Sequence, residues 1–163
     1  DAKLQRIATD FDVANGLSTY QTGRPNANAE QLLVALTSDH MFRIPCIRLA
    51  EAQLNHTPNV WMYLFDWKSR AFEGRLGATH ALEIPFAFNN LDRAGVDVFI
   101  GPGPMPQQLA DTMHNAWSGF IKNGSPDWPS YTIGARSTMV FAETSNTVND
   151  PMGDERLVWE GIR

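Results

Sequence analysis

Cysteine is scarce in this sequence and long apolar runs are absent, and each absence excludes a class of protein. Cys46 is the one cysteine among 163 residues. A disulfide within the chain and a zinc site built from several thiolates are therefore excluded. A lone cysteine is also typical of a reducing compartment, so we expect a cytoplasmic location. No stretch approaches the ~20 consecutive apolar residues that span a bilayer, and no membrane partner is expected.

Basic residues are too few to indicate a polyanionic partner. Lys and Arg number 13 against 18 Asp and Glu, a formal net charge of −5, so we expect no nucleic acid to bind. Hydrophobic residues make up 43% of the chain and charged residues 19%, which excludes a disordered or fibrous chain. The length is that of one domain. The opening DAKLQRIATDF has no signal peptide, and a start without Met also fits a processed or excised chain.

The histidines lack the spacing of a metal site. No pair follows HxxxH or HExxH, and no cluster of carboxylates accompanies them, so we expect no bound metal. The GPGPMP stretch of residues 101–106 matches neither GxGxxG nor a P-loop, and no cofactor is expected. His40 and His56 lie beside the ends of predicted helices, and His114 lies off an apolar stripe. Solvated or capping roles are expected for these three histidines.

Helical spacing of apolar residues predicts a chain rich in α-helix. The predicted helices cover residues 4–16, 27–39, 41–55 and 106–124. A polar linker over residues 20–28 separates the first two, and Pro45 marks a start or a kink in the third. Cys46 falls on the apolar stripe of that third helix with Phe42 and Leu49. We interpret it as a buried structural thiol rather than a nucleophile.

The period changes after the third predicted helix. A continuous apolar run over residues 60–65, VWMYLF, predicts a strand covered on both faces. Residues 137–142 predict a second strand, and residues 146–148 a partner for it across a short turn. The intervening segments are predicted as a loop, a short helical segment and turns, over residues 66–79, 81–91 and 92–106. Helices on either side of a buried strand indicate the α/β fold class.

His80 is the strongest catalytic candidate. It follows a glycine-rich loop after an apolar strand, where α/β enzymes place functional side chains. A histidine on a surface loop is the competing interpretation. The chain offers His80 no evident nucleophile, because no serine lies in a GxSxG motif. Glu143, Glu155 and Arg156 are interpreted as solvated charges near the C-terminus.

The segment around His80 also resembles a known family. Residues 74–92, GRLGATHALEIPFAFNNLD, resemble the catalytic-histidine segment of type-B carboxylesterases, the α/β-hydrolases that include p-nitrobenzyl esterases and cholinesterases. Gly77, His80 and Glu83 occupy positions of that pattern, followed by its Pro-Phe-x-Phe stretch. Further segments resemble the family in the correct order, over residues 37–53, 60–67, 116–131 and 138–141. The resemblance spans residues 26–159.

The resemblance implies part of a serine esterase. In that family the nucleophilic serine, the oxyanion-hole glycines and the triad acid precede the matched segments, and none is evident in residues 1–79. Residues 1–163 are therefore expected to be a single C-terminal segment of an α/β-hydrolase domain, mostly helical with a small remnant sheet. The expected partners are the upstream half of the same polypeptide and a small-molecule ester.

The resemblance also implies roles for the residues of the motif. His80 is implied as the general base and acid of the triad. Glu83 and Gly77 are implied as supports of the His80 loop. Phe86 and Phe88 are expected to pack beneath that loop.

Other interpretations stay open at this point. The chain is alternatively a non-catalytic binding or adhesion module, since some relatives of the family have lost the triad. A complete small hydrolase that uses one of its own serines is least favoured. If the main interpretation holds, the isolated chain is expected to be inactive and to self-associate, because an interior strand without its neighbour exposes unpaired backbone groups.

Overall fold

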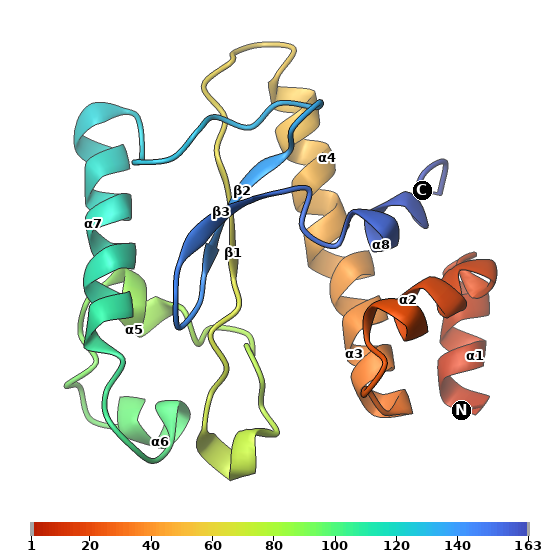
Figure 1. Ribbon diagram of the computed structural model, residues 1–163, viewed down its shortest axis with the longest axis horizontal. Coiled ribbons are helices and arrows are strands. Elements are labelled where there is room, and N and C mark those ends of the chain that lie inside the picture. The colour runs from red at the N-terminus through yellow and green to blue at the C-terminus, as the bar shows by residue number, and fades with distance from the viewer. Residues whose placement is uncertain (1, 163) are drawn as a thin grey trace. The chain divides into compact units, whose positions relative to one another are not determined.

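Residues from both ends of the chain form one unit of the fold, and the residues between them form a second. The computed structural model describes residues 2–162. The first unit joins the residues up to Thr57 to those from Asp150 onward, and the second is the continuous stretch Pro58–Asn149. In Figure 1 the red and orange helices and the deep-blue C-terminal helix belong to the first unit.

The first unit is helical. Its helices are α1 (Ala2–Asp10), α2 (Leu17–Gly23), α3 (Ala29–Ser38), α4 (Ile44–Gln53) and α8 (Gly153–Leu157). At the start of α3 the Asn28 side chain accepts a hydrogen bond from the N–H of Gln31, whose own side chain accepts one from the N–H of Asn28, both at 2.9 Å. Such a capping box satisfies two donors that a helix start leaves open. Leu32 and Leu36 of α3 then enter a core that includes Trp159.

A π-helical stretch, Asp39–Arg43, joins α3 to α4. Sequence spacing places Cys46 on a buried stripe, and this prediction is wrong, because Cys46 is exposed. Phe42 and Leu49 of the same stripe are 56% and 70% exposed. The buried residues of α4 are Ile44 and Ala50, so burial on this helix does not follow the predicted stripe.

The polar linker predicted over residues 20–28 is wrong in its first part, and the helix α8 is not predicted at all. Residues 20–23 belong to α2, whose Leu17 and Tyr20 are 5% and 0% exposed. A tyrosine can supply a large apolar ring to a core when its hydroxyl is hydrogen-bonded. Because the residues next to Tyr20 in the sequence are polar, the pattern does not reveal that Tyr20 is buried in the core.

The second unit contains a three-stranded sheet of order β1-β2-β3. β1 (Met62–Phe65) runs parallel to β2 (Ser137–Phe141), and β3 (Asn146–Asn149) runs antiparallel to β2 (Figure 1). All three predicted strands are confirmed. Within the residues described, β1 pairs with one strand only and stands at an edge of the sheet. Tyr63 in β1 is 37% exposed, so the predicted cover over both faces is incomplete.

Helices flank this sheet. They are α5 (Ile84–Ala87), α6 (Val96–Ile100) and α7 (Gln107–Asn123), with a 3-10 turn at Ala71–Gly74. The predicted long helix is confirmed as α7, which ends at Gly124 with a left-handed φ of 71°. Leu109 and Met113 of α7 enter the core of this unit with Phe86. Among the helices of residues 2–162, none is both long and apolar enough to cross a bilayer.

The prediction of turns alone over residues 92–106 is wrong, because α6 lies within that stretch. Gly95, with a φ of 89°, lets the chain enter this short helix sharply. Ile100 at its end is fully buried, and Val96 packs against the same core. The glycines that suggest turns therefore bracket a helix instead of replacing it.

Candidate active site

His80 is exposed at the start of a turn, and the chain enters the core two residues later. It begins the turn of residues 80–83, directly after the predicted loop. Ala81 has a left-handed φ of 66°, which is uncommon for a residue with a Cβ. Leu82, the next residue, is fully buried. The turn thus places a solvent-accessible imidazole two residues from a fixed core side chain.

The loop before His80 is closed by backbone pairing. The N–H of Ser69 donates to the carbonyl of Gly77 at 3.0 Å, and the two residues form an isolated antiparallel bridge. Gly77 has a φ of 60°, which glycine adopts without the strain that a Cβ adds. Gly77 therefore lies where the loop of residues 69–77 closes, three residues before His80. Its supporting role remains a prediction.

Glu83 lies at the start of α5 and is half-buried. Its carbonyl accepts hydrogen bonds from the N–H groups of Phe86 at 3.1 Å and Ala87 at 2.9 Å. Phe86 is fully buried and its ring centroid lies 5.3 Å from that of Trp67. Packing is therefore confirmed for Phe86, whereas Phe88 is 71% exposed and its prediction is wrong. The predicted role of Glu83 as a support of the His80 loop remains a prediction.

Two other histidines make contacts that are structural. His114 Nδ1 lies 2.9 Å from the carbonyl oxygen of Ala87, and since a carbonyl only accepts, Nδ1 carries the proton. This bond ties α7 to the end of α5. His40 stacks on the ring of Phe11 with centroids 3.8 Å apart. Across residues 2–162, no group of three or more His, Cys, Asp or Glu side chains could hold a metal ion.

The charged side chains near the C-terminus that are predicted to be solvated form ion pairs or hydrogen bonds with other side chains. Glu155 is 4% exposed and forms an ion pair with Arg24, so that prediction is wrong. Arg156 donates to both carboxylate oxygens of Asp150 at 2.9 Å, and these bonds raise the pKa of Arg156 above its ordinary value. Glu143 stays exposed and accepts a hydrogen bond from the Trp67 indole at 2.6 Å. Sequence spacing carries no signal for the partners of Glu155 and Glu143, which are distant in the chain.

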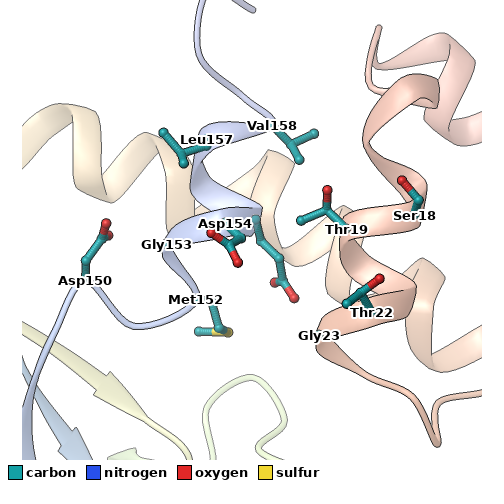
Figure 2. Close-up of a pocket in the computed structure, with 11 residues that line it drawn as sticks. Ser18, Thr19, Thr22, Gly23, Asp150, Met152, Gly153, Asp154, Leu157 and Val158 are labelled. Carbon is teal, nitrogen blue, oxygen red and sulfur yellow. The ribbon is translucent and has the colours of Figure 1, made fainter.

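An open pocket of about 900 Å³ lies in the first unit, between α2 and α8 (Figure 2). Its polar lining includes the hydroxyls of Ser18, Thr19 and Thr22 on α2 and the carboxylates of Asp150 and Asp154. These groups offer hydrogen bonds to a polar molecule. The lining contains no histidine or cysteine.

In the second unit, β1 is followed along the chain by a loop, the exposed His80 and the short helix α5. The chain shares the fold of α/β-hydrolase esterases. A carboxylesterase of Geobacillus stearothermophilus superposes with a TM-score of 0.78 and 31% identity, covering 96% of this chain and 34% of that one. A PNB esterase superposes with a TM-score of 0.69 and 29% identity, covering 90% and 33%.

The chain belongs to the Carboxylesterase family, whose sequence profile matches residues 8–156. It is 34% identical over 128 residues to the para-nitrobenzyl esterase of Bacillus subtilis (strain 168), covering 76% of this chain and 26% of the relative. It is 28% identical over 135 residues to the phenmedipham hydrolase of Pseudarthrobacter oxydans, covering 77% and 27%. The resemblance found in the sequence is confirmed. The chain spans about a quarter of the length of these curated relatives.

Proposed function

We propose that the complete protein containing this chain hydrolyses small carboxylic esters, and that His80 is its general base and acid. The observation that carries the proposal is the position of His80. It is exposed on a turn after a parallel strand, within a chain that belongs to the Carboxylesterase family. The name of one relative, a para-nitrobenzyl esterase, supports an ester as the substrate.

The proposed mechanism needs groups from the preceding part of the polypeptide. A serine there attacks the ester carbonyl, and the His80 imidazole takes the hydroxyl proton as the C–O bond of the tetrahedral adduct forms. The imidazole then returns that proton to the leaving alcohol. Water repeats the cycle on the acyl-enzyme and releases the carboxylic acid. An acidic residue, also upstream, holds the tautomer of His80.

The first experiment replaces His80 in the complete protein. We expect His80→Gln to fold normally and to lower kcat for a p-nitrophenyl ester by roughly 10³–10⁶-fold, as when one member of a triad is removed. His56→Gln is the matched control, because His56 is another exposed histidine and lies outside this turn. A loss of tenfold or less in His80→Gln would show that the imidazole is not the base.

The sequence of the complete protein provides a second test. A GxSxG motif upstream supports the enzyme. Its absence would favour the alternative of a non-catalytic binding or adhesion module. The upstream part is also proposed to be the structural partner of this chain, with a strand that pairs along the open edge of β1.

A further inference from the structure

The loop that precedes His80 is hydrogen-bonded to the end of α6, and a buried hydroxyl makes part of this contact. We propose that Ser69 is a positioning residue for His80, which fixes the loop of residues 69–77 against α6 and is assisted by the close approach of Gly101. This inference rests on the proposed role of His80. Ser69 does not reach the substrate and acts only by holding the loop.

The Ser69 hydroxyl forms hydrogen bonds both to α6 and to its own loop. Ser69 is 1% exposed. Its Oγ donates to the carbonyl of Phe99 in α6 at 2.7 Å and accepts from the N–H of Ala71 in its own loop at 3.0 Å. The N–H of Arg70 donates to the carbonyl of Ile100 at 2.8 Å. The loop and the last turn of α6 are therefore joined by side-chain and backbone bonds together.

Gly101 lets the two backbones approach. A Cβ built on Gly101 would lie 2.1 Å from the nitrogen of Ala71 and 2.3 Å from the carbonyl carbon of Arg70. Its φ of 88° and ψ of −174° lie in a region that glycine alone occupies readily. Any other residue at 101 must push the loop away from α6.

The attachment reaches His80 through the closed base of the loop. Ser69 is bridged to Gly77, three residues before His80, while Leu82 and Phe86 anchor the chain after it in the core. His80 therefore lies between two fixed points of the chain, the Ser69–Gly77 bridge before it and the buried Leu82 after it. The hydrogen bonds to α6 hold the first of these two points in place. A displacement of about 1 Å in a catalytic group can lower a rate by ~10²-fold.

The test compares three variants of the complete protein. Ser69→Ala removes the side-chain hydrogen bonds to Phe99, Ile100 and Ala71 without adding an atom. Gly101→Ala adds the clash with Ala71. Gly95→Ala is the control, because Gly95 lies at the other end of α6 with a φ of 89° and its Cβ would meet no atom within 4 Å. Active sites are counted by labelling the nucleophilic serine to completion with a fluorophosphonate probe, and kcat is expressed per labelled site.

We expect Ser69→Ala to lower kcat per labelled site by about 10–100-fold with KM within about threefold of the parent value. Gly101→Ala should lower kcat per site at least as far, and Gly95→Ala, which adds backbone strain without the clash, should lower it less than Gly101→Ala. Parental kcat per site in Ser69→Ala would overturn the proposal. So would a loss confined to the number of labelled sites, because that is the signature of a purely structural residue.

His80→Gln, assayed in parallel, separates the two proposals. If it abolishes turnover while Ser69→Ala is fully active, the role of Ser69 is wrong and that of His80 stands. If His80→Gln keeps its activity, the proposed role of His80 fails and the role of Ser69 fails with it, although ester hydrolysis itself stands.

Discussion

The indole N–H of Trp159 donates a hydrogen bond of 2.7 Å to the hydroxyl of Tyr20, 139 positions away in the sequence. The hydroxyl in turn donates to Asp39 at 2.6 Å, and Arg43 donates to both oxygens of the same carboxylate at 2.6 and 2.7 Å. Tyr20, Asp39 and Trp159 are all buried. This chain of bonds links the C-terminal residues of the first unit to α2 and to the π-helical stretch.

Replacing Tyr20 with Phe should destabilise the first unit. The change leaves the Trp159 N–H without its acceptor and removes a donor from Asp39, at a cost of roughly 1–3 kcal/mol. We expect urea unfolding to show this loss. Trp159→Phe should behave similarly, and the double variant should lose less than the sum of the two. Strict additivity would show that the bond between the two side chains contributes nothing.

The same hydroxyl should make stability sensitive to alkaline pH. Burial, followed by the hydrogen bond to Asp39, raises the pKa of Tyr20 above its ordinary value. The folded state therefore keeps a proton that the unfolded chain loses near pH 10. The contribution of the protonated Tyr20 hydroxyl to the free energy of unfolding is fully present below about pH 10. It is lost as pH rises above that value, by up to ~1.4 kcal/mol per pH unit. Unfolding free energies at pH 9–11 should converge for the parent and Tyr20→Phe, and a constant difference would refute this assignment.

The isolated 163-residue chain should not be an ester hydrolase. Its residues offer an imidazole without the proposed nucleophile or oxyanion donors, and each such donor is worth roughly 2.7–4 kcal/mol in enzymes from which it has been removed. We expect hydrolysis of p-nitrophenyl acetate to equal that by free imidazole at the same concentration. Saturable turnover that disappears in His80→Ala would revive a complete small hydrolase.

The isolated chain should also self-associate. β1 has a strand neighbour on one side only among the residues described. Beside it, an apolar pocket of about 190 Å³ is lined by aromatic side chains, including Tyr63, Trp117 and Phe120, which are 37%, 41% and 47% exposed. Open strand edges and apolar patches favour association. We expect sedimentation velocity to report oligomers whose share rises with concentration.

A pair of variants tests where this association occurs. Phe120→Lys places a charge beside the β1 edge and should shift the population toward monomer. Phe72→Lys is the control, because Phe72 is 61% exposed and does not line that pocket. A monomeric parent chain at high concentration, without binding of a hydrophobic dye, would contradict self-association.

Local sequence patterns predicted the parts of the fold that local physics determines. The strand at β1, the β2-β3 pair and the long helix α7 follow from apolar runs, a short turn and helical spacing. The family was also evident, because the segment around His80 carries its motif. These features need no knowledge of distant partners.

The errors come from interactions that span the chain. Glu155 resembles any solvated carboxylate until Arg24 is brought beside it. Cys46 is exposed although its apolar neighbours place it on a stripe, because the contacts of α4 with the rest of the unit bury Ile44 and Ala50 instead. Nothing in the sequence around Ser69 indicates its hydrogen bonds to α6, although Gly101 could have suggested a close approach of two backbones. Their roles depend on tertiary contacts that a single sequence does not encode locally.

The discontinuity of the first unit has a consequence for the order of events on the ribosome. The second unit is one continuous stretch that ends at Asn149, so its strands and helices are all available to one another before α8 is made. The first unit lacks α8 and Trp159 until the residues after Asp150 emerge. Because domains fold as their residues become available, Tyr20 must wait for a further 139 residues to be translated before its hydroxyl receives the Trp159 hydrogen bond. Of the two units, the one that begins first along the chain is thus the last to be completed.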